Sequence, residues 1–395
     1  MIKTALILAA GEGTRMMPLT ATRPKPLLPV AGRPMIAWTI DALRKAGITD
    51  IYVLVGRNEE KMRAALEGKA KFIRQEKREG TANAVGCAEG HISEPFICMN
   101  GDLVVEESLF AGIAKRYGEK KSNIITVTQA SEPKHFGVIE LDNSGKVISI
   151  EEKPEKPKSN LINAGVYVFE PSIFTHIKKT KKSPRGEYEI TDTLRTAGAS
   201  GFIYNGFWLD VGKPWDMLDA NEFYLKRMKS SVEGEVQKNA TLEGEVSVGK
   251  GTVIRAGSYI KGPVSIGRDC KIGPNCFIRP YTSIGDGCHI GNAVEIKNCI
   301  IIGKSNVPHL SYVGDSIIGE NCNFGAGTNV ANLRFDNAEV KMNIQGEHQS
   351  SGRRKLGCVM ADNVKTGINV SIMPGKKIGP NKLIPPLFVV DKDME

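Results

Sequence analysis

The stretch "VSIGRDCKIGPNCFIRPYTSIGDGCHIGNAVEI", residues 264–296, decides the fold of the second half of this chain. A valine, leucine or isoleucine returns at every sixth position, and this period runs unbroken from Val236 to Ile302. Repeats of six residues are typical of parallel β-helices, in which three short strands form one coil and each repeated apolar side chain points inward. The repeat therefore predicts a parallel β-helix.

Small or β-branched residues occupy a second fixed position, four residues after each repeated apolar residue. Cys270, Cys276 and Cys288 stand at this position, and Cys322 follows Ile318 at the same spacing. We expect these thiols to pack in a tight interior and to have no redox or nucleophilic role. Glycines follow many of the apolar residues, as is typical of tight corners between strands: Gly249, Gly267, Gly273, Gly285, Gly291 and Gly303.

The period breaks in "IIGKSNVPHLSYVG", residues 301–314, because ten residues separate Ile302 from Tyr312, where the period resumes. The break predicts a coil with a four-residue bulge that carries His309 out of the β-helix. A second excursion runs roughly from residue 331 to residue 357. Loops that leave a solenoid often carry its binding function, so two such loops suggest a site where coils of neighbouring subunits meet.

The first 228 residues lack this period and alternate strand-like apolar runs with helix-like segments, which is typical of an α/β sheet. We therefore expect two domains, at residues 1–228 and 229–395. The expected strands are residues 4–9, 51–55, 96–99, 124–127 and 166–169. The expected helices are residues 35–46, 59–66, 82–89 and 213–229.

Composition narrows the classes of partner. The 53 basic and 44 acidic residues give a net charge of +9, which favours anionic ligands. No aromatic residues interleave with the lysine doublets, so we expect no nucleic acid. The apolar run from Ala5 to Ala10 is too short for a signal peptide or membrane span. Eight cysteines without a CxxC pair predict neither zinc nor disulfides, and favour a reducing cytoplasm.

A glycine-rich loop, "AAGEGTRM", follows the first expected strand. Gly11 and Gly13 would let backbone N–H groups approach phosphate oxygens. The loop lacks the ending of a P-loop, and Met16 replaces the third glycine of a dinucleotide fingerprint, so alone it leaves a nucleotide site and a structural turn open. Arg15 and Lys25, the latter in "RPKPLLPV", add two cations near the same strand end.

Two aspartates follow apolar strands: Asp102 in "MNGDLVV" and Asp210 in "FWLDVGKPWD". Each could be a turn or cap residue. However, Mg²⁺ in proteins takes one or two carboxylates together with water and substrate phosphate. Together with the glycine-rich loop and its two cations, these aspartates favour phosphoryl or nucleotidyl transfer.

In these motifs the first half resembles the sugar-1-phosphate nucleotidylyltransferases. The resemblance continues through "QEKREGTANAV", "NGD", "FGVIE", "EEKP" and "NAGVYVF". The second half resembles the acetyltransferase part of the bifunctional N-acetylglucosamine-1-phosphate uridylyltransferase and glucosamine-1-phosphate acetyltransferase family, in "IRPYTSIGDG", "GNAVEIKN", "HLSYVGD" and "NFGAGT". The implied fold is a Rossmann-like α/β nucleotidyltransferase domain followed by a left-handed parallel β-helix of hexapeptide repeats.

For nucleotidyl transfer, the resemblance implies one residue set for each part of the substrates. The triphosphate would be held by Gly11, Gly13 and Arg15, with Lys25 beside the reacting phosphates. The base would be read by Gln75, Gly80 and Thr81, and Mg²⁺ held by Asp102 and Asp210. The sugar phosphate would be bound by Gly137, Glu152, Lys153 and Asn163.

For acetyl transfer, the resemblance implies His309 as the general base, since imidazole can take a proton from an amine as it attacks a thioester. The phosphate of the amino sugar would be held by Arg279 and Lys297, with Tyr312, Asn323, Asn332 and Lys341 nearby. Arg353, Arg354 and Lys355 are candidates for the phosphates of coenzyme A.

Taken together, the sequence predicts a bifunctional, cytoplasmic sugar-nucleotide enzyme that uses Mg²⁺ and acetyl-CoA. Its substrates would be a nucleoside triphosphate, UTP or dTTP, and a sugar 1-phosphate, and the family implies a homotrimer. Two alternatives remain open. One is a monofunctional glucose-1-phosphate thymidylyltransferase with a structural β-helix, and the other is a non-catalytic assembly protein of the same architecture.

Overall fold

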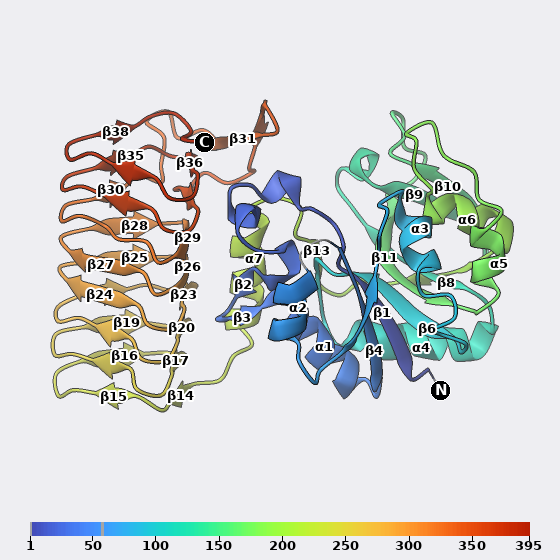
Figure 1. Cartoon of the computed structure of the whole chain (residues 1–395), viewed down its shortest axis with the longest axis horizontal. Coiled ribbons are helices and arrows are strands. Elements are labelled where there is room, and N and C mark those ends of the chain that lie inside the picture. Colours follow the sequence, from blue (N-terminus) through green and yellow to red (C-terminus); the bar gives the residue numbers. More distant parts are fainter. Residues whose placement is uncertain (1, 57–58) are drawn as a thin grey trace. The chain divides into compact units, whose positions relative to one another are not determined.

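The computed structural model describes residues 2–56 and 59–395. The chain folds into two compact units. Unit 1 comprises residues 1–12 and 35–210, and unit 2 comprises residues 13–34 and 211–395. The glycine-rich loop is therefore split, with Gly11 in unit 1 and Gly13 in unit 2. Figure 1 labels many of the elements of both units.

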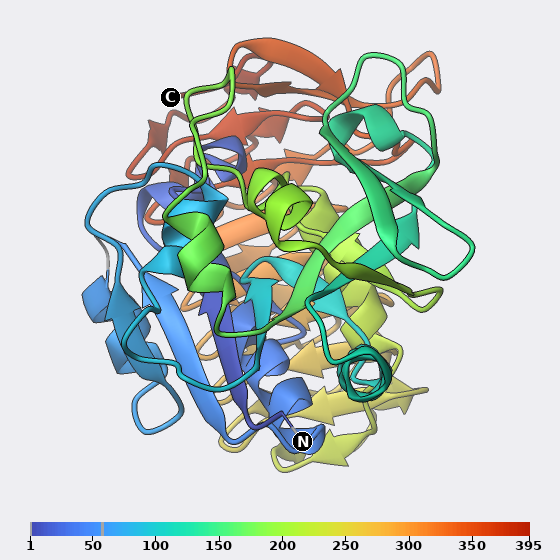
Figure 2. The ribbon, with the colours of Figure 1, turned by 90° about the vertical axis from the view of Figure 1, so that its right-hand side faces the viewer.

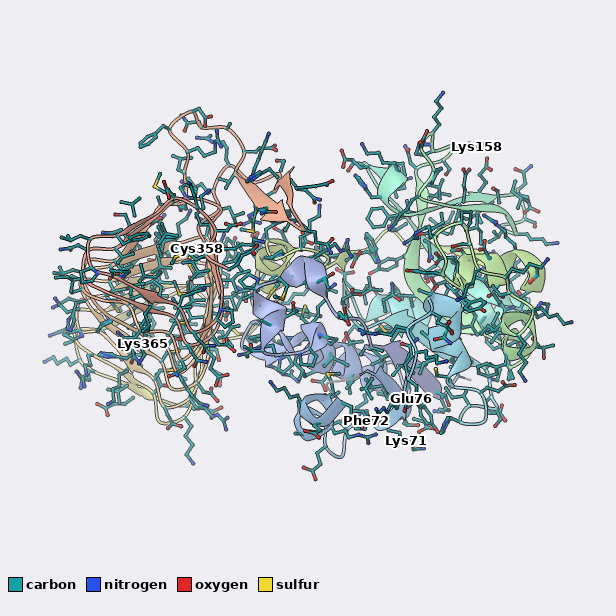
Figure 3. All side chains as sticks on the ribbon, turned by 45° about the horizontal axis from the view of Figure 1, so that its top comes forward. Lys71, Phe72, Glu76, Lys158, Cys358 and Lys365 are labelled. Atoms are coloured by element: carbon teal, nitrogen blue, oxygen red, sulfur yellow. The ribbon has the colours of Figure 1, made fainter. Side chains whose placement is uncertain are left out.

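Unit 1 is built on a mixed nine-stranded sheet whose main path runs β10-β9-β11-β6-β1-β4-β5, while β8 joins β11 to β12. The strands are β1 (Thr4–Leu8), β4 (Asp50–Val55), β5 (Lys71–Arg74), β6 (Phe96–Asn100), β8 (Ile124–Gln129), β9 (Gly137–Leu141), β10 (Val147–Glu152), β11 (Leu161–Phe169) and β12 (Ser200–Ile203). The parallel strands β1 and β4 are the adjacent blue strands in Figure 2. In Figure 3, Lys71 and Phe72 mark the edge strand β5.

Helices cover this sheet and bury its core. They are α1 (Met35–Lys45), α2 (Glu59–Ala65), α3 (Thr81–Gly86), α4 (Ser108–Lys120), α5 (Ile173–Ile177) and α6 (Ile190–Ala197), with a 3₁₀ turn, η4 (Pro133–His135). Apolar residues of α3, α5 and α6 form one core cluster with inward residues of β1, β6, β8 and β11, such as Val85, Phe174 and Leu194 against Leu6 and Tyr167. A separate antiparallel pair, β7 (Leu103–Val105) and β13 (Trp208–Asp210), carries both predicted magnesium ligands at one end.

Unit 2 is dominated by a left-handed parallel β-helix with three sheets. The first contains β14 (Ser231–Val232), β17 (Val246–Val248), β20 (Val264–Ile266), β23 (Thr282–Ile284), β26 (Ile300–Gly303), β29 (Ile317–Glu320), β33 (Val359–Met360) and β36 (Lys377–Ile378). The second contains β15 (Glu235–Val236), β18 (Val253–Ile254), β21 (Lys271–Ile272), β24 (His289–Asn292) and β27 (Asn306–His309), with β34 (Lys365–Thr366) and β37 (Leu383–Ile384) further along. The third contains β16 (Thr241–Glu243), β19 (Tyr259–Lys261), β22 (Phe277–Ile278), β25 (Glu295–Lys297), β28 (Tyr312–Gly314), β30 (Asn329–Val330), β35 (Ser371–Ile372) and β38 (Val389–Val390).

The interior of the β-helix confirms the predicted repeat. One continuous cluster of buried side chains runs from Val246 to Val390. It includes the thiols of Cys270, Cys276 and Cys288, which are free and buried as expected for packing groups. Cys358, labelled in Figure 3, lies in the same cluster.

The predicted four-residue bulge around His309 is wrong. Ile284, Ile290 and Ile296 pair with Ile301, Val307 and Val313 of the next coil, seventeen residues later in each case. One side of this coil thus has five residues, so the interior position shifts from 302 to 301, and the sixfold spacing continues through 307 and 313. Ile302 and Tyr312 are only half-buried neighbours of the true interior residues. His309 therefore ends strand β27 at a corner of an ordinary coil.

Of the six glycines predicted to turn corners, Gly273 alone has a positive φ, 87°, as that role requires. Gly249, Gly285 and Gly291 do not have positive φ, so they do not turn the corners. A Cβ at Gly285 would overlap the carbonyl oxygen of Ile302 in the next coil, and one at Gly291 would overlap that of Pro308. These glycines allow close approach between successive coils, while residues such as Asn275, with φ 52°, adopt the left-handed corner conformation.

The second predicted excursion is confirmed. Strand β30 ends at Val330 and the coil resumes at Val359 with β33. The intervening chain forms an antiparallel hairpin of β31 (Lys341–Ile344) and β32 (Glu347–Ser350). No helix among residues 2–56 and 59–395 is long and apolar enough to cross a membrane.

Residues 13–34 and the segment after Asp210 complete unit 2. They contain three 3₁₀ turns, η1 (Thr14–Met16), η2 (Leu19–Ala21) and η3 (Lys25–Leu27), a short hairpin of β2 (Pro29–Val30) and β3 (Arg33–Pro34), and helix α7 (Asp216–Leu225). The side-chain oxygen of Asn221, in α7, accepts a hydrogen bond from the backbone N–H of Ala31 at 2.7 Å. The amide nitrogen of the same residue donates to the carbonyl oxygen of Tyr281 in the β-helix at 2.8 Å. Residues 13–34 are thus fixed to the β-helix partly through α7.

Candidate active sites

The two predicted magnesium ligands come together in unit 1. Strand β13 pairs antiparallel with β7 so that Asp210 lies opposite Leu103, the residue after Asp102. Gly101 leads into this turn, where its N–H donates to the carbonyl oxygen of Leu8 at the end of β1. Two half-buried carboxylates, one in the turn before β7 and one at the end of β13, match the donors that Mg²⁺ takes beside water and phosphate oxygens, so these residues fit the ion.

The predicted phosphate-binding cations lie in unit 2. Gly13 has φ 65°, and a Cβ there would lie 3.1 Å from Cβ of Lys25, which explains why glycine stands where the loop passes the buried lysine. Arg15 belongs to the turn η1, and its guanidinium lies beside Gly212, where a Cβ would be 3.5 Å from Nη1. Sequence reasoning missed Gly212, although "LDVGKPWD" contains it.

The residues predicted to read the base form a compact group at α3. Gln75 follows β5, is buried, and donates from Nε2 to Oδ1 of Asn83 at 2.8 Å. Gly80 has φ 114°, and a Cβ there would press on the backbone of Tyr188. The hydroxyl oxygen of Thr81 accepts a hydrogen bond from the N–H of Ile190 at 2.9 Å. This bond connects the first residue of α3 to the first residue of α6.

The four residues predicted for the sugar phosphate lie around the start of β9. Gly137 pairs with Glu152 across β9 and β10, and a Cβ at Gly137 would lie 3.0 Å from Oε2 of that carboxylate. The same Cβ would lie 3.5 Å from Cβ of Asn163, whose Nδ2 donates to the Tyr167 hydroxyl at 2.8 Å. Lys153 has φ 48° and donates its backbone N–H to Phe136. Glycine at 137 thus leaves room beside a carboxylate and an amide.

Burial sets the electrostatics of this group. It raises the pKa of Glu152, although the nearby charges of Lys153 and Arg185 oppose the shift. Burial likewise raises the pKa of Glu189, whose Oε1 lies 3.3 Å from Nη1 of Arg185. The same Arg185 nitrogen lies 3.5 Å from Glu152. Sequence reasoning missed Arg185 and Glu189, since neither stands in a quoted motif.

In the β-helix, three predicted residues meet around a buried carboxylate that sequence reasoning also missed. Asp315 follows β28 at a corner, with its side chain only 5% exposed. Lys297 Nζ lies 3.2 Å from its Oδ2, and Asn332 Nδ2 donates to the same oxygen at 2.5 Å. Asn332 also donates to the Tyr312 hydroxyl at 3.1 Å, and burial raises the pKa of that phenol. Asp315 therefore fixes the lysine and the amide, in a group that Asn298 completes.

Arg279 lies one coil before Lys297, because Ile278 and Ile296 pair between β22 and β25. Its Nη1 contacts Oε1 of Glu295 at 2.8 Å, and both side chains are more than a third exposed. Two cations on successive coils of one face can receive a phosphate group.

His309 and Asn323 lie on a different face. His309 is exposed at the end of β27, and Asn323 bridges the same sheet one coil later, opposite Asn306. Strand β28, three residues long, runs from the corner near His309 to the corner of Asp315, and an extended strand of that length spans about 10 Å. The structure thus divides the predicted acetyltransferase residues between two corners of the same coils.

The excursion gives mixed results. Lys341 begins strand β31 and is exposed in the hairpin. Arg353, a candidate for coenzyme A phosphates, instead forms an ion pair with Asp219 of α7 at 2.5 Å, with a side chain only 19% exposed. Arg354 donates to Asn337 at 3.2 Å, and Lys355 bridges to Leu333 through the backbone. The Arg353 side chain thus connects the excursion to α7 through this ion pair.

Comparisons with known proteins agree with both halves. Residues 4–227 match the nucleotidyl transferase family, and residues 260–393 match the GMPPB C-terminal domain. A bifunctional protein GlmU of Methanocaldococcus jannaschii is 43% identical over 397 residues, covering 99% of this chain and 95% of the relative. A bifunctional sugar-1-phosphate nucleotidylyltransferase/acetyltransferase of Sulfurisphaera tokodaii is also 43% identical, covering 99% and 98%.

Among solved structures, UDP-glucose pyrophosphorylase in complex with UDP-glucose superposes with a TM-score of 0.52 at 28% identity, over 58% of this chain and 100% of that chain. This likeness supports the fold of the first half, and the full-length relatives support both halves. The chain therefore belongs to the nucleotidyl transferase family, among its bifunctional members in which an acetyltransferase β-helix follows the nucleotidyltransferase domain.

Proposed function

We propose that residues 229–395 transfer the acetyl group of acetyl-CoA to glucosamine 1-phosphate or galactosamine 1-phosphate. Residues 1–228 would then join N-acetylglucosamine 1-phosphate or glucose 1-phosphate to UTP or dTTP and release pyrophosphate. The observation that carries this proposal is the likeness to bifunctional relatives over nearly the whole chain. It disfavours both a monofunctional enzyme and a non-catalytic assembly protein.

In nucleotidyl transfer, an oxygen of the sugar phosphate attacks the α-phosphorus of the triphosphate, and pyrophosphate leaves. The barrier is mainly one of charge and alignment, so positioning and neutralisation dominate catalysis. We assign Arg15 and Lys25, with Gly11 and Gly13, to the triphosphate. Asp102 and Asp210 would hold Mg²⁺, which neutralises phosphate charge when bound.

The remaining assignments in the first half follow substrate chemistry. Gln75 carries an amide that can both donate to and accept from a base, and Gly80 and Thr81 would form the adjoining wall. Glu152 and Asn163 offer an acceptor and an amide to sugar hydroxyls beside the space left at Gly137. Lys153 supplies a cation for the sugar phosphate.

In acetyl transfer, the neutral amine of the sugar attacks the thioester carbonyl carbon, a C–N bond forms, the C–S bond breaks, and coenzyme A leaves as its thiol. His309 would take the proton that the amine loses and pass it to the sulfur. Arg279 and Lys297 would hold the sugar phosphate, with Tyr312, Asn323, Asn332 and Lys341 lining the site. Asp315 is added to this set as the residue that orients Lys297 and Asn332.

A homotrimer is supported by the division of these residues between two corners. A site that needs both His309 and Lys297 would take one corner from each of two subunits around a threefold axis. Exposed apolar side chains follow one another along the corner of His309: Leu310, Ile368 and Leu387, each more than half exposed. Such a patch suits contact with another copy of the chain. We assign both reactions to the cytoplasm, in line with eight unpaired cysteines.

Pyrophosphate release tests the first assignment. UTP and dTTP are each incubated with either sugar phosphate, using wild type, Lys25→Ala and Asp210→Asn. We expect both variants to lose at least about a hundredfold in rate, as for removal of a strong charge-stabilising group. A matched control is Lys121→Ala, which alters an exposed lysine at the end of α4. Full activity in Lys25→Ala and Asp210→Asn would contradict the assignment.

Mixed trimers test the second assignment. His309→Ala and Lys297→Ala are each expected to lose acetyl transfer. Co-expressed in equal amounts, they should recover about a quarter of wild-type activity, because each shared site then has even odds of an intact residue from either subunit. No recovery, in a complex proven to contain both variants, would contradict a site shared between subunits.

A further inference from the structure

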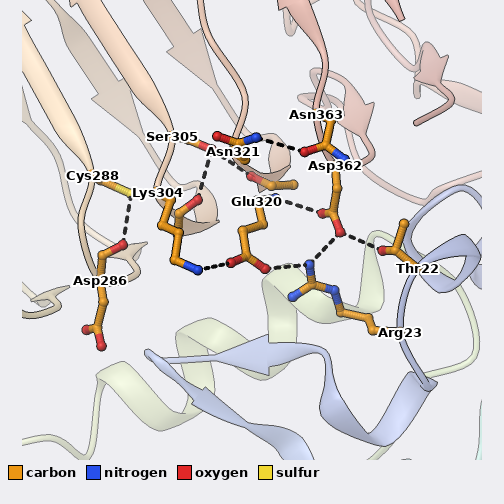
Figure 4. A network of polar contacts seen from close by, with 12 residues as sticks. Thr22, Arg23, Asp286, Cys288, Lys304, Ser305, Glu320, Asn321, Asp362 and Asn363 are labelled. Carbon is orange, nitrogen blue, oxygen red and sulfur yellow. Dashed lines mark hydrogen bonds and ion pairs between the residues drawn. The ribbon is translucent and has the colours of Figure 1, made fainter. Parts of the chain in front are cut away.

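The segment that carries Arg15 and Lys25 is held by the β-helix through an ion pair. Nη2 of Arg23 lies 2.6 Å from Oδ2 of Asp362, which follows strand β33. The same nitrogen lies 3.2 Å from Oε2 of Glu320 at the end of β29. The hydroxyl of Thr22 donates to Oδ2 of Asp362 at 2.6 Å. Figure 4 shows these contacts converging on Asp362.

This ion pair is shielded from water. The side chains of Arg23 and Asp362 are only 16% and 12% exposed. Nε of Arg23 is buried and has no hydrogen-bond partner among the described residues, so the buried cation relies on its two carboxylates. A buried charge that loses its partner is strongly unfavourable, so the pair holds the segment firmly.

The β-helix also fixes the carboxylate of Asp362. Oδ1 of Asp362 accepts the backbone N–H of Glu320 at 2.7 Å, which joins two successive coils. Oε1 of Glu320 in turn contacts Nζ of Lys304 at 3.0 Å. The carboxylate thus directs one oxygen to the preceding coil and the other to the segment, in a fixed orientation.

The same segment is held at two further points. At the tip of the β31–β32 hairpin, Nε2 of Gln345 donates to the hydroxyl of Thr14 at 3.0 Å. At the other end, Ala31 is bonded to Asn221, as described above. Arg15 directly follows the first point and Lys25 lies two residues after Arg23, so each candidate cation stands close to a fixed point.

We propose that Asp362 is a positioning residue of nucleotidyl transfer: through Arg23 it sets where the β-helix holds Lys25 and Arg15 for the triphosphate. The proposal rests on the assignment of those two cations made above. Cations aimed at phosphate stabilise a transition state only when their positions are fixed beforehand. A residue of the acetyltransferase half would then control the rate of the other reaction without touching its substrates.

The test compares Asp362→Asn with Asp286→Asn in the full-length protein. Asp286 lies on the same side of the β-helix in Figure 4 and pairs with Arg268 at 2.7 Å, and both side chains are more than half exposed. For Asp362→Asn we expect kcat/KM for the triphosphate to fall at least about tenfold, with KM for the sugar phosphate unchanged. Acetyl transfer, measured on the same preparation, should stay at the wild-type rate.

Asp362→Glu, which keeps the negative charge, should restore part of the lost rate, whereas a purely structural defect would lower both activities together. Equal nucleotidyl rates in Asp362→Asn and Asp286→Asn would overturn the proposal, as would a parallel loss of acetyl transfer. Lys25→Ala separates a failure of the cation assignment from a failure of the role proposed for Asp362. If it leaves nucleotidyl transfer intact, the assignment of the cations fails. If it abolishes the reaction while Asp362→Asn behaves like the control, only the role of Asp362 fails.

Discussion

The β-helix and the mixed sheet of unit 1 place their functional side chains by different rules. In the β-helix, register alone stacks Arg279 one coil before Lys297 on the same face. In unit 1, Gly137, Glu152 and Asn163 come from three strands and meet only through sheet pairing. A repeat therefore reveals its geometry in the sequence, whereas a mixed sheet reveals only its elements.

The largest effect is expected when the buried carboxylate of Asp315, which holds Lys297 and Asn332 in the β-helix, is removed. Asp315→Ala leaves Lys297 beside a space that its partner filled, so we expect a loss of about 3 kcal/mol in unfolding free energy. Acetyl transfer should fall with it, while nucleotidyl transfer at moderate temperature persists. Chemical denaturation and both assays measure this.

Glu243→Ala is the matched control for that prediction, because Glu243 pairs with Lys261 on the exposed surface of the same β-helix at 3.1 Å. An exposed pair contributes less than about 1 kcal/mol. Equal losses of unfolding free energy in the two variants would mean that burial of Asp315 does not increase the contribution of its ion pair to stability.

A second prediction concerns the glycines that let coils approach. Gly291→Ala forces a methyl group against Pro308 one coil later and should cost about 1–3 kcal/mol. Gly118→Ala adds the same methyl group at an exposed position of helix α4, with open space around it, and should stabilise by about 0.5–1 kcal/mol. The two melting temperatures should move in opposite directions. A shift in the same direction would argue against coil contact as the role of Gly291.

A third prediction follows from the buried carboxylate of Glu152. Burial raises the pKa of Glu152 in the folded state above that of an ordinary glutamate, about 4.3. The folded protein therefore holds this proton more tightly than the unfolded chain, and stability is lost as the pH rises from the unfolded pKa through the folded pKa. Glu152→Gln removes this loss. Its melting temperature should therefore fall less than that of wild type between pH 4 and neutrality, while its KM for the sugar phosphate rises.

Glu151→Gln, at the exposed neighbouring position of β10, is the control for the pH series. It should follow the wild-type curve. If Glu152→Gln also followed that curve, burial of Glu152 would not influence stability.

The smallest effect concerns thiol reactivity. Burial raises the pKa of Cys322 to about 11, and Cys288 to about 12, so few of these thiols are ionised near neutral pH. Cys87 alone among the cysteines is half-buried, outside the β-helix. We expect iodoacetamide to label Cys87 first in the native protein, as measured by peptide mapping. Equally fast labelling of Cys322 would contradict a closed interior.

The sequence was sufficient for the β-helix interior because each repeat carries its own apolar residue. It failed where one coil has five residues on a side: Ile302 and Tyr312 are apolar neighbours of the true interior residues, Ile301 and Val313, and only strand pairing distinguishes them. The bulge inferred from that misreading does not exist, although His309 is still exposed.

Residues whose roles depend on distant contacts could not be found from the sequence. Asp315 stands in the quoted stretch "HLSYVGD" but at neither of the two repeated positions, and Arg185 lies outside the repeats. The importance of both residues lies in partners that the fold brings near. Arg353 looked like a phosphate ligand because it stands in a basic run, but Asp219 already neutralises it. Arg23 stands in a motif that predicts phosphate binding, yet its own partners are carboxylates of the β-helix.

The central claim is that one chain carries two active sites, and thiol release from acetyl-CoA tests it most directly. Wild type, His309→Ala and His289→Ala are incubated with acetyl-CoA and glucosamine 1-phosphate or galactosamine 1-phosphate. His289 is the control, since it lies one coil earlier in the same sheet. We predict release by wild type and His289→Ala, and a loss of at least about a hundredfold in His309→Ala, as for removal of a general base. Equal release by all three proteins, or none by wild type with either sugar, would contradict the account.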